Sequence, residues 1–292
     1  METKIMYGQE VAQNMLESLE WDPHHTLYIL SNQADPASAV YVRNKKKKCE
    51  EVGVRCVIYD ISNADIERIK YILYDEISFN SERYYVIIQK PLPIHLREYE
   101  KEIDAFFKKA PGVDIDAFGG DLSTEFKTPA TPLGVMKMLD YYVGVKNLDG
   151  LNAVVLGRSE IVGKPMAQLL LNANCTVTVC HSHTKNLKDY TRNADLIISA
   201  IGKPKLITSD CIGDNRPIIV DVGINRDENG KLCGDVDFEN VKDKCSFISP
   251  VPKGVGVLTV ASLVYKMGKK KKLKKNSVKR LTNKSHCDIM LL

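Results

Sequence analysis

Residues 154–165 have the sequence Val154-Val155-Leu156-Gly157-Arg158-Ser159-Glu160-Ile161-Val162-Gly163-Lys164-Pro165. The apolar residues that open this stretch are typical of a parallel strand covered on both faces. Gly157 and Gly163 bracket a sharp backbone turn, and Pro165 suits the first turn of a helix. We therefore predict a buried strand, a tight turn and a helix whose free N–H groups and positive dipole end face an anion.

The residues that follow this turn indicate that the anion belongs to a dinucleotide. The glycine spacing alone is weak evidence, because Gly-x5-Gly is not the common Gly-x-Gly-x-x-Gly, and a plain strand-to-helix turn remains the alternative. A second β-rich run, residues 176–180, ends without the carboxylate that an NAD-specific site usually offers to the ribose. Ser182, His183 and Arg158 are placed to meet a 2′-phosphate instead. The sequence therefore favours NADP over NAD.

Composition is that of a soluble globular protein with room for two modest domains. The chain has 292 residues, of which 44% are hydrophobic and 27% charged. No apolar run approaches the ~20 residues of a membrane span, and the first residues lack the pattern of a signal peptide. The eight cysteines form no Cys-x-x-Cys pair and no zinc spacing. We expect a cytoplasmic protein with reduced thiols and no metal site.

The basic charge is concentrated at the C-terminus. Residues 269–292 contain nine Lys or Arg and one Asp, so the net charge of +4 leaves residues 1–268 at −4. Such a tail is either a patch for nucleic acid or an anionic surface, or a solvated terminus. We favour the solvated terminus and expect no nucleic-acid partner.

Strands and helices alternate along the chain, which indicates parallel βαβ units. We predict an α/β protein in which an N-terminal domain, residues 1–130, precedes a Rossmann-type doubly wound parallel sheet, residues 131–268, and a basic tail, 269–292. A helix from residue 134, after Pro132, links the two domains. Ligands of such sheets bind beyond the carboxyl ends of the strands, so the active site is expected in the cleft between the domains. The predicted strands are 26–30, 54–59, 84–88, 153–156, 177–180, 196–200, 218–222 and 247–249, and the other predicted helices are 38–51, 64–73 and 165–172.

Several further motifs accompany the glycine turn, and together they carry a family resemblance. Gly157-Arg158-Ser159-x-x-Val162-Gly163-x-Pro165 resembles the signature of the bifunctional methylenetetrahydrofolate dehydrogenase/methenyltetrahydrofolate cyclohydrolase family. The other matching motifs occur in family order over residues 27–262. They are Asp35-Pro36-Ala37-Ser38-x-x-Tyr41-Val42-x-x-Lys45, Gln89-x-Pro91-Leu92-Pro93, Pro111-x-x-Asp114-Ile115-Asp116, Thr131-Pro132-x-Gly134, Asp221-Val222-Gly223-Ile224-Asn225-Arg226, Gly234-Asp235-Val236 and Pro250-Val251-Pro252-x-Gly254-Val255-Gly256.

The resemblance implies an oxidoreductase and hydrolase of one-carbon metabolism that is a homodimer. Such an enzyme oxidises 5,10-methylenetetrahydrofolate with NADP and hydrolyses the methenyl product to 10-formyltetrahydrofolate. The resemblance implies that Lys45 is the acid/base residue, that Tyr41 lies against the aminobenzoyl ring of the folate, and that Gln89 and Asp116 position the substrate. The implied cofactor-binding residues are Gly157, Arg158, Ser159, Gly163, Ser182 and Ile224.

The residues themselves leave simpler interpretations open. Tyr41 and Lys45 share a helix face, but Lys45 begins a run of four lysines, which taken alone is typical of a solvated surface. Gln89 is equally a strand-end residue that pairs with backbone groups. Asp114 and Asp116 point the same way in an extended segment, where Asp116 suits the amino-pyrimidine edge of a pterin or caps a turn.

Departures from the family pattern lie near the predicted site: Lys90, Val113, Ala117, Ala130, Lys253 and the pair Val257-Leu258. They bear on substrate affinity and on the balance of the two activities. Two alternatives remain: an NAD-linked dehydrogenase without hydrolase activity, and a dinucleotide-dependent binding protein whose tail contacts nucleic acid.

Overall fold

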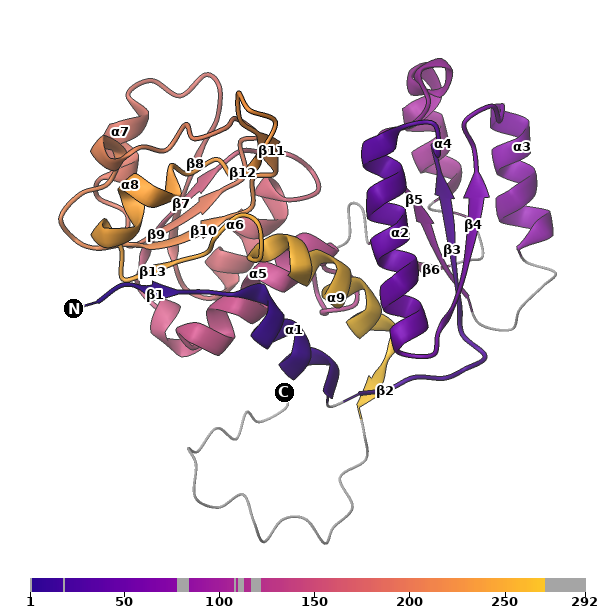
Figure 1. Ribbon diagram of the computed structural model, residues 1–292, viewed down its shortest axis with the longest axis horizontal. Coiled ribbons are helices and arrows are strands. Elements are labelled where there is room, and N and C mark those ends of the chain that lie inside the picture. The colour runs from indigo at the N-terminus through magenta and orange to yellow at the C-terminus, as the bar shows by residue number, and fades with distance from the viewer. Residues whose placement is uncertain are drawn as a thin grey trace, which may run out of the picture.

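The computed structural model describes residues 2–17, 19–77, 84–107, 109, 113–116 and 122–270. Two α/β halves are each built around a parallel sheet (Figure 1). The α-helices are α1 (Gly8–Glu17), α2 (Pro36–Glu51), α3 (Ile66–Tyr71), α4 (Glu100–Phe107), α5 (Ala130–Tyr142), α6 (Gly163–Asn172), α7 (Leu187–Thr191), α8 (Phe238–Val241) and α9 (Val255–Met267). The strands are β1 (Lys4–Ile5), β2 (Leu19–Glu20), β3 (Thr26–Ser31), β4 (Arg55–Asp60), β5 (Tyr84–Ile88), β6 (Val113–Asp114), β7 (Asn152–Leu156), β8 (Thr176–Cys180), β9 (Leu196–Ser199), β10 (Ile218–Asp221), β11 (Asn225–Arg226), β12 (Leu232–Cys233), β13 (Phe247–Ile248) and β14 (Lys269–Lys270). Short 3-10 and π-helical turns are η1 (Ile72–Glu76), η2 (Ile94–Tyr99), η3 (Val145–Leu148), η4 (Ser209–Cys211) and η5 (Lys242–Lys244).

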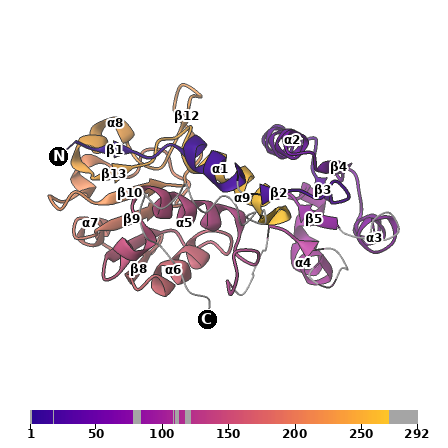
Figure 2. The ribbon, with the colours of Figure 1, turned by 90° about the horizontal axis from the view of Figure 1, so that it is seen from below.

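The smaller half is a four-stranded parallel sheet with the order β4-β3-β5-β6. Side chains alternate between the two faces of a strand, so β3 contributes to two separate packing layers. Leu27 and Ile29 join the core under α2, whereas Tyr28 and Leu30 pack with the residues of α3 and α4. Figure 2 shows α2 on one face of this sheet and α3 and α4 on the other. The carboxyl ends of β5 and β6 therefore lie beside each other next to α2.

The larger half is a six-stranded parallel sheet with the order β1-β13-β10-β9-β7-β8. The chain leaves β7 toward β8 on one side and returns to β9 on the other side of β7. The order of strands thus reverses between β7 and β9, which is where doubly wound sheets bind ligands. The turn after β7 and the loop after β9 lie at this point. The predicted α/β class with a Rossmann-type sheet is confirmed.

One apolar core joins the two halves. It includes Val42 and Ile87 of the smaller half together with Val155, Ile198 and Leu258 of the larger half. Helices α5 and α9 pack against each other, and α9 extends from the larger half to α2 (Figure 1). The last turn of α9 therefore reaches the smaller half.

The structure differs from the predicted organisation in several places. The prediction that the linking helix starts after Pro132 is wrong, because α5 begins at Ala130 and Pro132 lies in its first turn, where its missing N–H costs nothing. Helices α1 and α9 were not predicted. The division at residue 130 assigns residues 4–17 to the first domain, whereas β1 pairs with β13 in the larger sheet and α1 packs on α9.

The start of the basic tail also differs from its prediction. Lys269 and Lys270 form β14, which pairs with β2 and places the Lys269 ammonium 3.9 Å from an Asp22 carboxylate oxygen. A frayed terminus is therefore wrong for these two residues, because the sheet pairs their backbone groups. Residues 271–292 lie outside the described residues, as do Pro111, of the motif that contains Asp116, and Ala117, one of the departures from the family pattern. In the part of the chain that is described, no helix is long and apolar enough to cross a bilayer.

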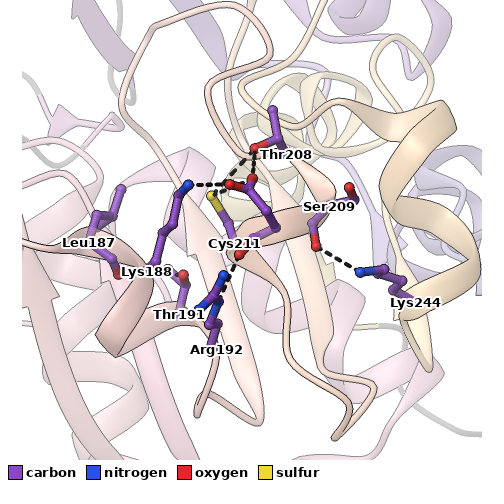
Figure 3. A network of polar contacts seen from close by, with 9 residues as sticks. Leu187, Lys188, Thr191, Arg192, Thr208, Ser209, Cys211 and Lys244 are labelled. Carbon is purple, nitrogen blue, oxygen red and sulfur yellow. Dashed lines mark hydrogen bonds and ion pairs between the residues drawn. The ribbon is translucent and has the colours of Figure 1, made fainter.

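A polar network anchors α7 to η4 (Figure 3). The Lys188 ammonium pairs with the Asp210 carboxylate, and the hydroxyl of Thr208 donates to the same carboxylate. The Arg192 Nε donates to the Asp210 carbonyl at 2.8 Å. The hydrogen bond from Lys188 lowers the pKa of Asp210 to about 2. Helix α7 lies at the far end of its half from α2 in both ribbon views, so this network joins α7 to η4 at a distance from α2.

Candidate active site

Helix α2 determines which of four consecutive lysines is buried. Asp35 caps the helix by accepting from the Ser38 N–H at 2.8 Å, and Pro36 occupies its first turn. The helical period then places Ser38, Val42, Lys45 and Cys49 on the buried face. Lys45 is 4% exposed, whereas the three lysines after it retain contact with solvent. The surface interpretation of the lysine run is therefore wrong for Lys45.

The Lys45 ammonium lies between two polar groups that come from the ends of neighbouring strands. It donates to Gln89 Oε1 at 2.9 Å and lies 3.6 Å from Asp116 Oδ2. The Gln89 amide nitrogen donates to the Lys90 carbonyl at 2.8 Å, so the orientation of the amide is determined at both of its ends. The structure thus brings together three residues that are 27 to 71 positions apart in the chain. A buried amine held in this way is suited to exchanging protons with a bound substrate.

Asp114 and Asp116 form a turn rather than an extended segment. Asp114 Oδ1 accepts from the Asp116 N–H at 3.0 Å, so Asp114 has the capping role. The expectation that both carboxylates point the same way along an extended strand is therefore wrong. The turn directs Asp116 toward Lys45.

Sequence analysis missed a second lysine beside this group. Lys266, in the last turn of α9, is 7% exposed and donates from Nζ to the Ile115 carbonyl at 2.8 Å. Burial lowers the pKa of Lys266 to about 8, although the nearby carboxylates of Asp116 and Asp114 act in the opposite direction. The available signal was a single cation in a 13-residue helix that is otherwise uncharged.

Lys90, one of the departures from the family pattern, is held away from Lys45. Its ammonium lies 2.9 Å from both a Glu100 and an Asp104 carboxylate oxygen of α4. Its charge is therefore balanced within its own half.

A cleft of about 1100 Å³ separates α2 from the larger half. Of the predicted site residues, Tyr41 and Ile224 line it. Tyr41 lies one helical turn before Lys45, and burial raises the pKa of its hydroxyl. Facing α2 are the loop after β10, residues 222–226, and the segment 250–257 that enters α9. Lys45, Gln89 and Asp116 are not among the residues that line the cleft, so the structure places Tyr41 at its wall and the buried amine behind that wall.

The glycine turn has the predicted strand–turn–helix form. Gly157 has φ +115°, and a Cβ atom there would lie 2.2 Å from the Ala200 carbonyl oxygen of the loop after β9. A Cβ on Gly163 would lie 2.3 Å from the Gly157 oxygen. The two glycines therefore allow close backbone approaches at the switch point, the place between β7 and β9 where the strand order reverses.

The N–H groups that begin α6 are not free as predicted. Ser159 Oγ accepts from the Val162 N–H at 3.2 Å and the Gly163 N–H at 3.3 Å, and the Ser159 carbonyl accepts from Lys164. The hydroxyl hydrogen of Ser159 still has no protein partner among the described residues and can donate to an anion. Arg158, whose side chain is exposed, precedes Ser159 at the same strand end.

Ser182 lies at the end of the adjacent strand. Leu156 pairs with Cys180 in the sheet, so Arg158 and Ser182 each follow a paired residue by two positions. The Ser182 and His183 side chains are exposed, and the turn is held by the His183 N–H, which donates to His181 Nδ1. Gly157, Arg158, Ser159, Gly163 and Ser182 thus lie at the carboxyl edge of β7 and β8 and are not part of the cleft lining around Tyr41.

Two buried aspartates tie the neighbouring loops together, and sequence analysis missed their role. Asp235 accepts from the Ile201, Gly202 and Lys203 N–H groups of the loop after β9. Asp221 accepts from the N–H groups of Gly223, Asp235 and Val236. Burial raises the pKa of Asp221 to about 7. The loops that border the switch point are therefore held by carboxylates rather than by apolar packing alone.

These features define a class of protein, namely a two-domain α/β protein with a Rossmann-type half and a buried lysine held by an amide and a carboxylate. Residues 129–275 match the model of the tetrahydrofolate dehydrogenase/cyclohydrolase NAD(P)-binding domain, and residues 4–105 match that of the catalytic domain of the same family. The chain therefore belongs to the tetrahydrofolate dehydrogenase/cyclohydrolase family.

Individual relatives are similar over nearly their whole length. The chain is 41% identical over 277 residues to the bifunctional protein FolD of Campylobacter concisus, covering 89% of this chain and 95% of the relative. It is 42% identical over 279 residues to that of Nitrosomonas europaea, with coverage of 90% and 92%. Among solved structures, the FolD methylenetetrahydrofolate dehydrogenase/cyclohydrolase of Campylobacter jejuni has a TM-score of 0.77 at 36% identity, with coverage of 91% and 97%. The Trypanosoma brucei enzyme, solved with NADP and an inhibitor, has a TM-score of 0.75 at 29% identity, with coverage of 91% and 96%.

Proposed function

We propose that the chain oxidises 5,10-methylenetetrahydrofolate with NADP and hydrolyses the methenyl product to 10-formyltetrahydrofolate. The observation that carries the hydrolase step is the buried Lys45 ammonium between Gln89 and Asp116. An NAD-linked dehydrogenase would need no such group. Membership in the family carries the pairing of the two activities.

In the hydrolase step, water adds to the methenyl carbon, and the bond from that carbon to the ring nitrogen then breaks. Lys45, in its neutral amine form, accepts a proton from the adding water and returns it to the nitrogen that leaves. The remaining hydroxyl proton is released to solvent as the formyl C=O bond forms. Gln89 holds the amine by its 2.9 Å hydrogen bond and so determines where the proton is exchanged. Asp116 binds the amino-pyrimidine edge of the pterin, where a carboxylate can pair with adjacent N–H donors. Tyr41 covers the aminobenzoyl ring from the wall of the cleft.

In the dehydrogenase step, the protein contributes position rather than a nucleophile. When bound, NADP would supply a nicotinamide ring that takes the hydride from the substrate methylene group. Arg158, Ser159 and Ser182 would hold its phosphate groups at the carboxyl edge of β7 and β8, while Gly157 and Gly163 keep the turn narrow. Ile224 contributes apolar surface on the wall of the cleft. Holding the two rings in one orientation is the main source of rate enhancement in such a step.

The side chains at the carboxyl edge of β7 and β8 suit NADP by their chemistry. The end of β8 offers a hydroxyl at Ser182 and imidazoles at His181 and His183 but no carboxylate. A carboxylate would repel a 2′-phosphate, whereas a hydroxyl and the nearby Arg158 can pair with it. This donor set supports NADP rather than NAD.

The test is absorbance at two wavelengths during turnover of 5,10-methylenetetrahydrofolate, with NADP and NAD in parallel. We expect NADPH to form without accumulation of the methenyl compound. Accumulation of the methenyl compound would mean that the hydrolase step is absent, and a preference for NAD would overturn the cofactor assignment. Folded protein that reduces neither cofactor would contradict the enzyme assignment.

We also propose that the protein is a cytoplasmic homodimer. Strand β8 is a terminal strand of the larger sheet, so the backbone groups on its outer side have no partner strand within the described residues. Val179 on β8 and Leu171 on α6 are 38% and 55% exposed. An edge with exposed apolar side chains is typical of an interface. Light scattering should give twice the chain mass of 32.8 kDa, and Val179→Lys should give the single mass. A single mass for the unaltered chain would contradict the proposal.

A further inference from the structure

The two buried lysines of the described residues belong to one group of charges. Lys45 is 4% exposed and Lys266 is 7% exposed. Lys266 donates to the carbonyl of Ile115, the residue between Asp114 and Asp116, while Lys45 lies 3.6 Å from the Asp116 carboxylate. Two ammonium groups and two carboxylates thus lie around the 114–116 turn, where the last turn of α9 packs against the smaller half. The charges that act on Lys266 are those of Asp116 and Asp114, and Lys45 of α2 contacts the same Asp116.

The position of Lys266 links the site to the cofactor-binding half. Helix α9 begins at the cleft, where Gly256 and Val257 line the wall opposite α2. It ends 10 residues later at Met267, beside the 114–116 turn. A single rigid helix therefore connects the wall of the cleft with the segment that carries Asp116.

Stability does not explain a charge at this position. The other buried side chains of the last two turns of α9 are apolar except for that of Ser262, and they are Ala261, Leu263, Val264 and Met267. Burying an ammonium is costly, and an apolar side chain of similar length would avoid that cost. The hydrogen bond to the Ile115 carbonyl offsets only part of it. A buried charge that is costly and faces a substrate-binding carboxylate indicates a role in function.

We propose that Lys266 is a positioning residue for the folate substrate. Its ammonium holds the 114–116 turn through the Ile115 carbonyl and shares the charge of Asp116 with Lys45. Asp116 is thereby directed toward the pterin, and Lys45 is not confined to an ion pair with Asp116. This inference rests on the proposed function and adds to it a residue from the cofactor-binding half.

The experiment compares Lys266→Met and Lys266→Gln with the unaltered enzyme. The control is Lys70→Met on α3, a lysine that pairs with Glu67 at the surface. The measured quantities are kcat, the KM for 5,10-methylenetetrahydrofolate and the KM for NADP, each followed from pH 6 to pH 10. Gln retains a donor for the Ile115 carbonyl but not the charge, so it separates the two contributions and guards against a Met variant that does not fold.

Loss of both the charge and the hydrogen bond should raise the folate KM about tenfold or more at pH 7 in Lys266→Met, and loss of the charge alone should raise it by a smaller factor in Lys266→Gln. The KM for NADP should stay within about twofold of the unaltered value, because Lys266 affects only the folate substrate, through the position of Asp116. The folate KM of the unaltered enzyme should rise with pH as Lys266 loses its proton, and this rise should be absent from both variants. A purely structural role would instead change both KM values together and leave the pH profile in place.

A folate KM unchanged in folded Lys266→Met, or a pH profile identical to that of the unaltered enzyme, would overturn the proposal. If the unaltered enzyme shows no turnover, the proposed function fails and Lys266 is tested by binding alone. Calorimetry with 5-formyltetrahydrofolate then serves as the readout. Weaker binding by both Lys266 variants than by Lys70→Met supports the positioning role, and equal binding contradicts it.

Discussion

Lys45 differs from the three lysines that follow it because its side chain is buried, whereas theirs retain contact with solvent. Lys46 pairs with Glu50 at 3.9 Å and Lys48 with Glu51 at 2.9 Å, both at the surface of α2. Lys45 is directed inward by the helical period and meets Gln89 and Asp116. Four identical residues therefore have different surroundings because successive positions on a helix are rotated by about 100°.

Replacing Lys45 with Met should abolish the hydrolase activity of a folded protein. Loss of a general acid/base typically costs about 100-fold to 10,000-fold in rate. Lys46→Met on the same helix is the matched control, because the Lys46 side chain is 46% exposed and pairs with Glu50 at the surface. Hydrolysis of the methenyl compound, measured by the loss of its absorbance, should be unchanged in Lys46→Met. Full hydrolase activity in Lys45→Met would refute the acid/base assignment.

Among the elements, the turn between β7 and α6 depends on backbone more than on side chains. Gly157 has a positive φ and lies against the carbonyl of Ala200. Asp235 in turn holds the loop that follows Ala200 through three N–H groups. The turn after β7 and the loop after β9 are thus in van der Waals contact at Gly157 and Ala200, and a methyl group on Gly157 would push them apart.

A comparison of Gly157→Ala with Gly53→Ala isolates this close approach. Both glycines have positive φ, but a Cβ on Gly53 would meet nothing within 4 Å. Gly53→Ala should cost about 1 kcal/mol in free energy of unfolding, the cost of left-handed backbone alone. Gly157→Ala adds overpacking and should cost about 3 kcal/mol. Urea denaturation measures both values, and equal costs would show that the loops are not in contact in solution.

On the scale of the whole molecule, a single apolar core runs through both halves and α9 extends across their junction. Lys266 is the charged residue that this arrangement buries in the last turn of α9. Its protonation therefore affects the stability of the entire chain, since α9 packs against α1, α2 and α5.

The stability of the unaltered protein relative to Lys266→Met should rise between about pH 8 and pH 10.5. Burial lowers the pKa of Lys266 to about 8 from an ordinary value of 10.5. Between these two values the unfolded chain binds more protons than the folded one, so the free energy of unfolding increases with pH. The expected rise is about 3 kcal/mol, which urea denaturation at a series of pH values measures. A difference that stays constant over this range would contradict the buried charge.

The sequence by itself determined the α/β class, the parallel strands and the family. Strand periodicity, glycine turns and short motifs are local patterns that depend on neighbouring residues, and they predicted β3, β5 and β7 closely. The motifs also identified Lys45, Gln89 and Asp116 as candidates, through the resemblance rather than through spacing.

Only the tertiary structure decided which groups meet. The contact of Lys266 with the 114–116 turn joins residues 151 positions apart, and the pairing of β1 with β13 joins residues 243 positions apart. No local pattern marks such contacts, because they depend on how two sheets and α9 pack around one core. The burial that lowers the pKa of Lys266 and raises that of Asp221 arises from the same packing. The electrostatic character of the site is thus a property of the folded chain, since desolvation depends on every element that covers a charge.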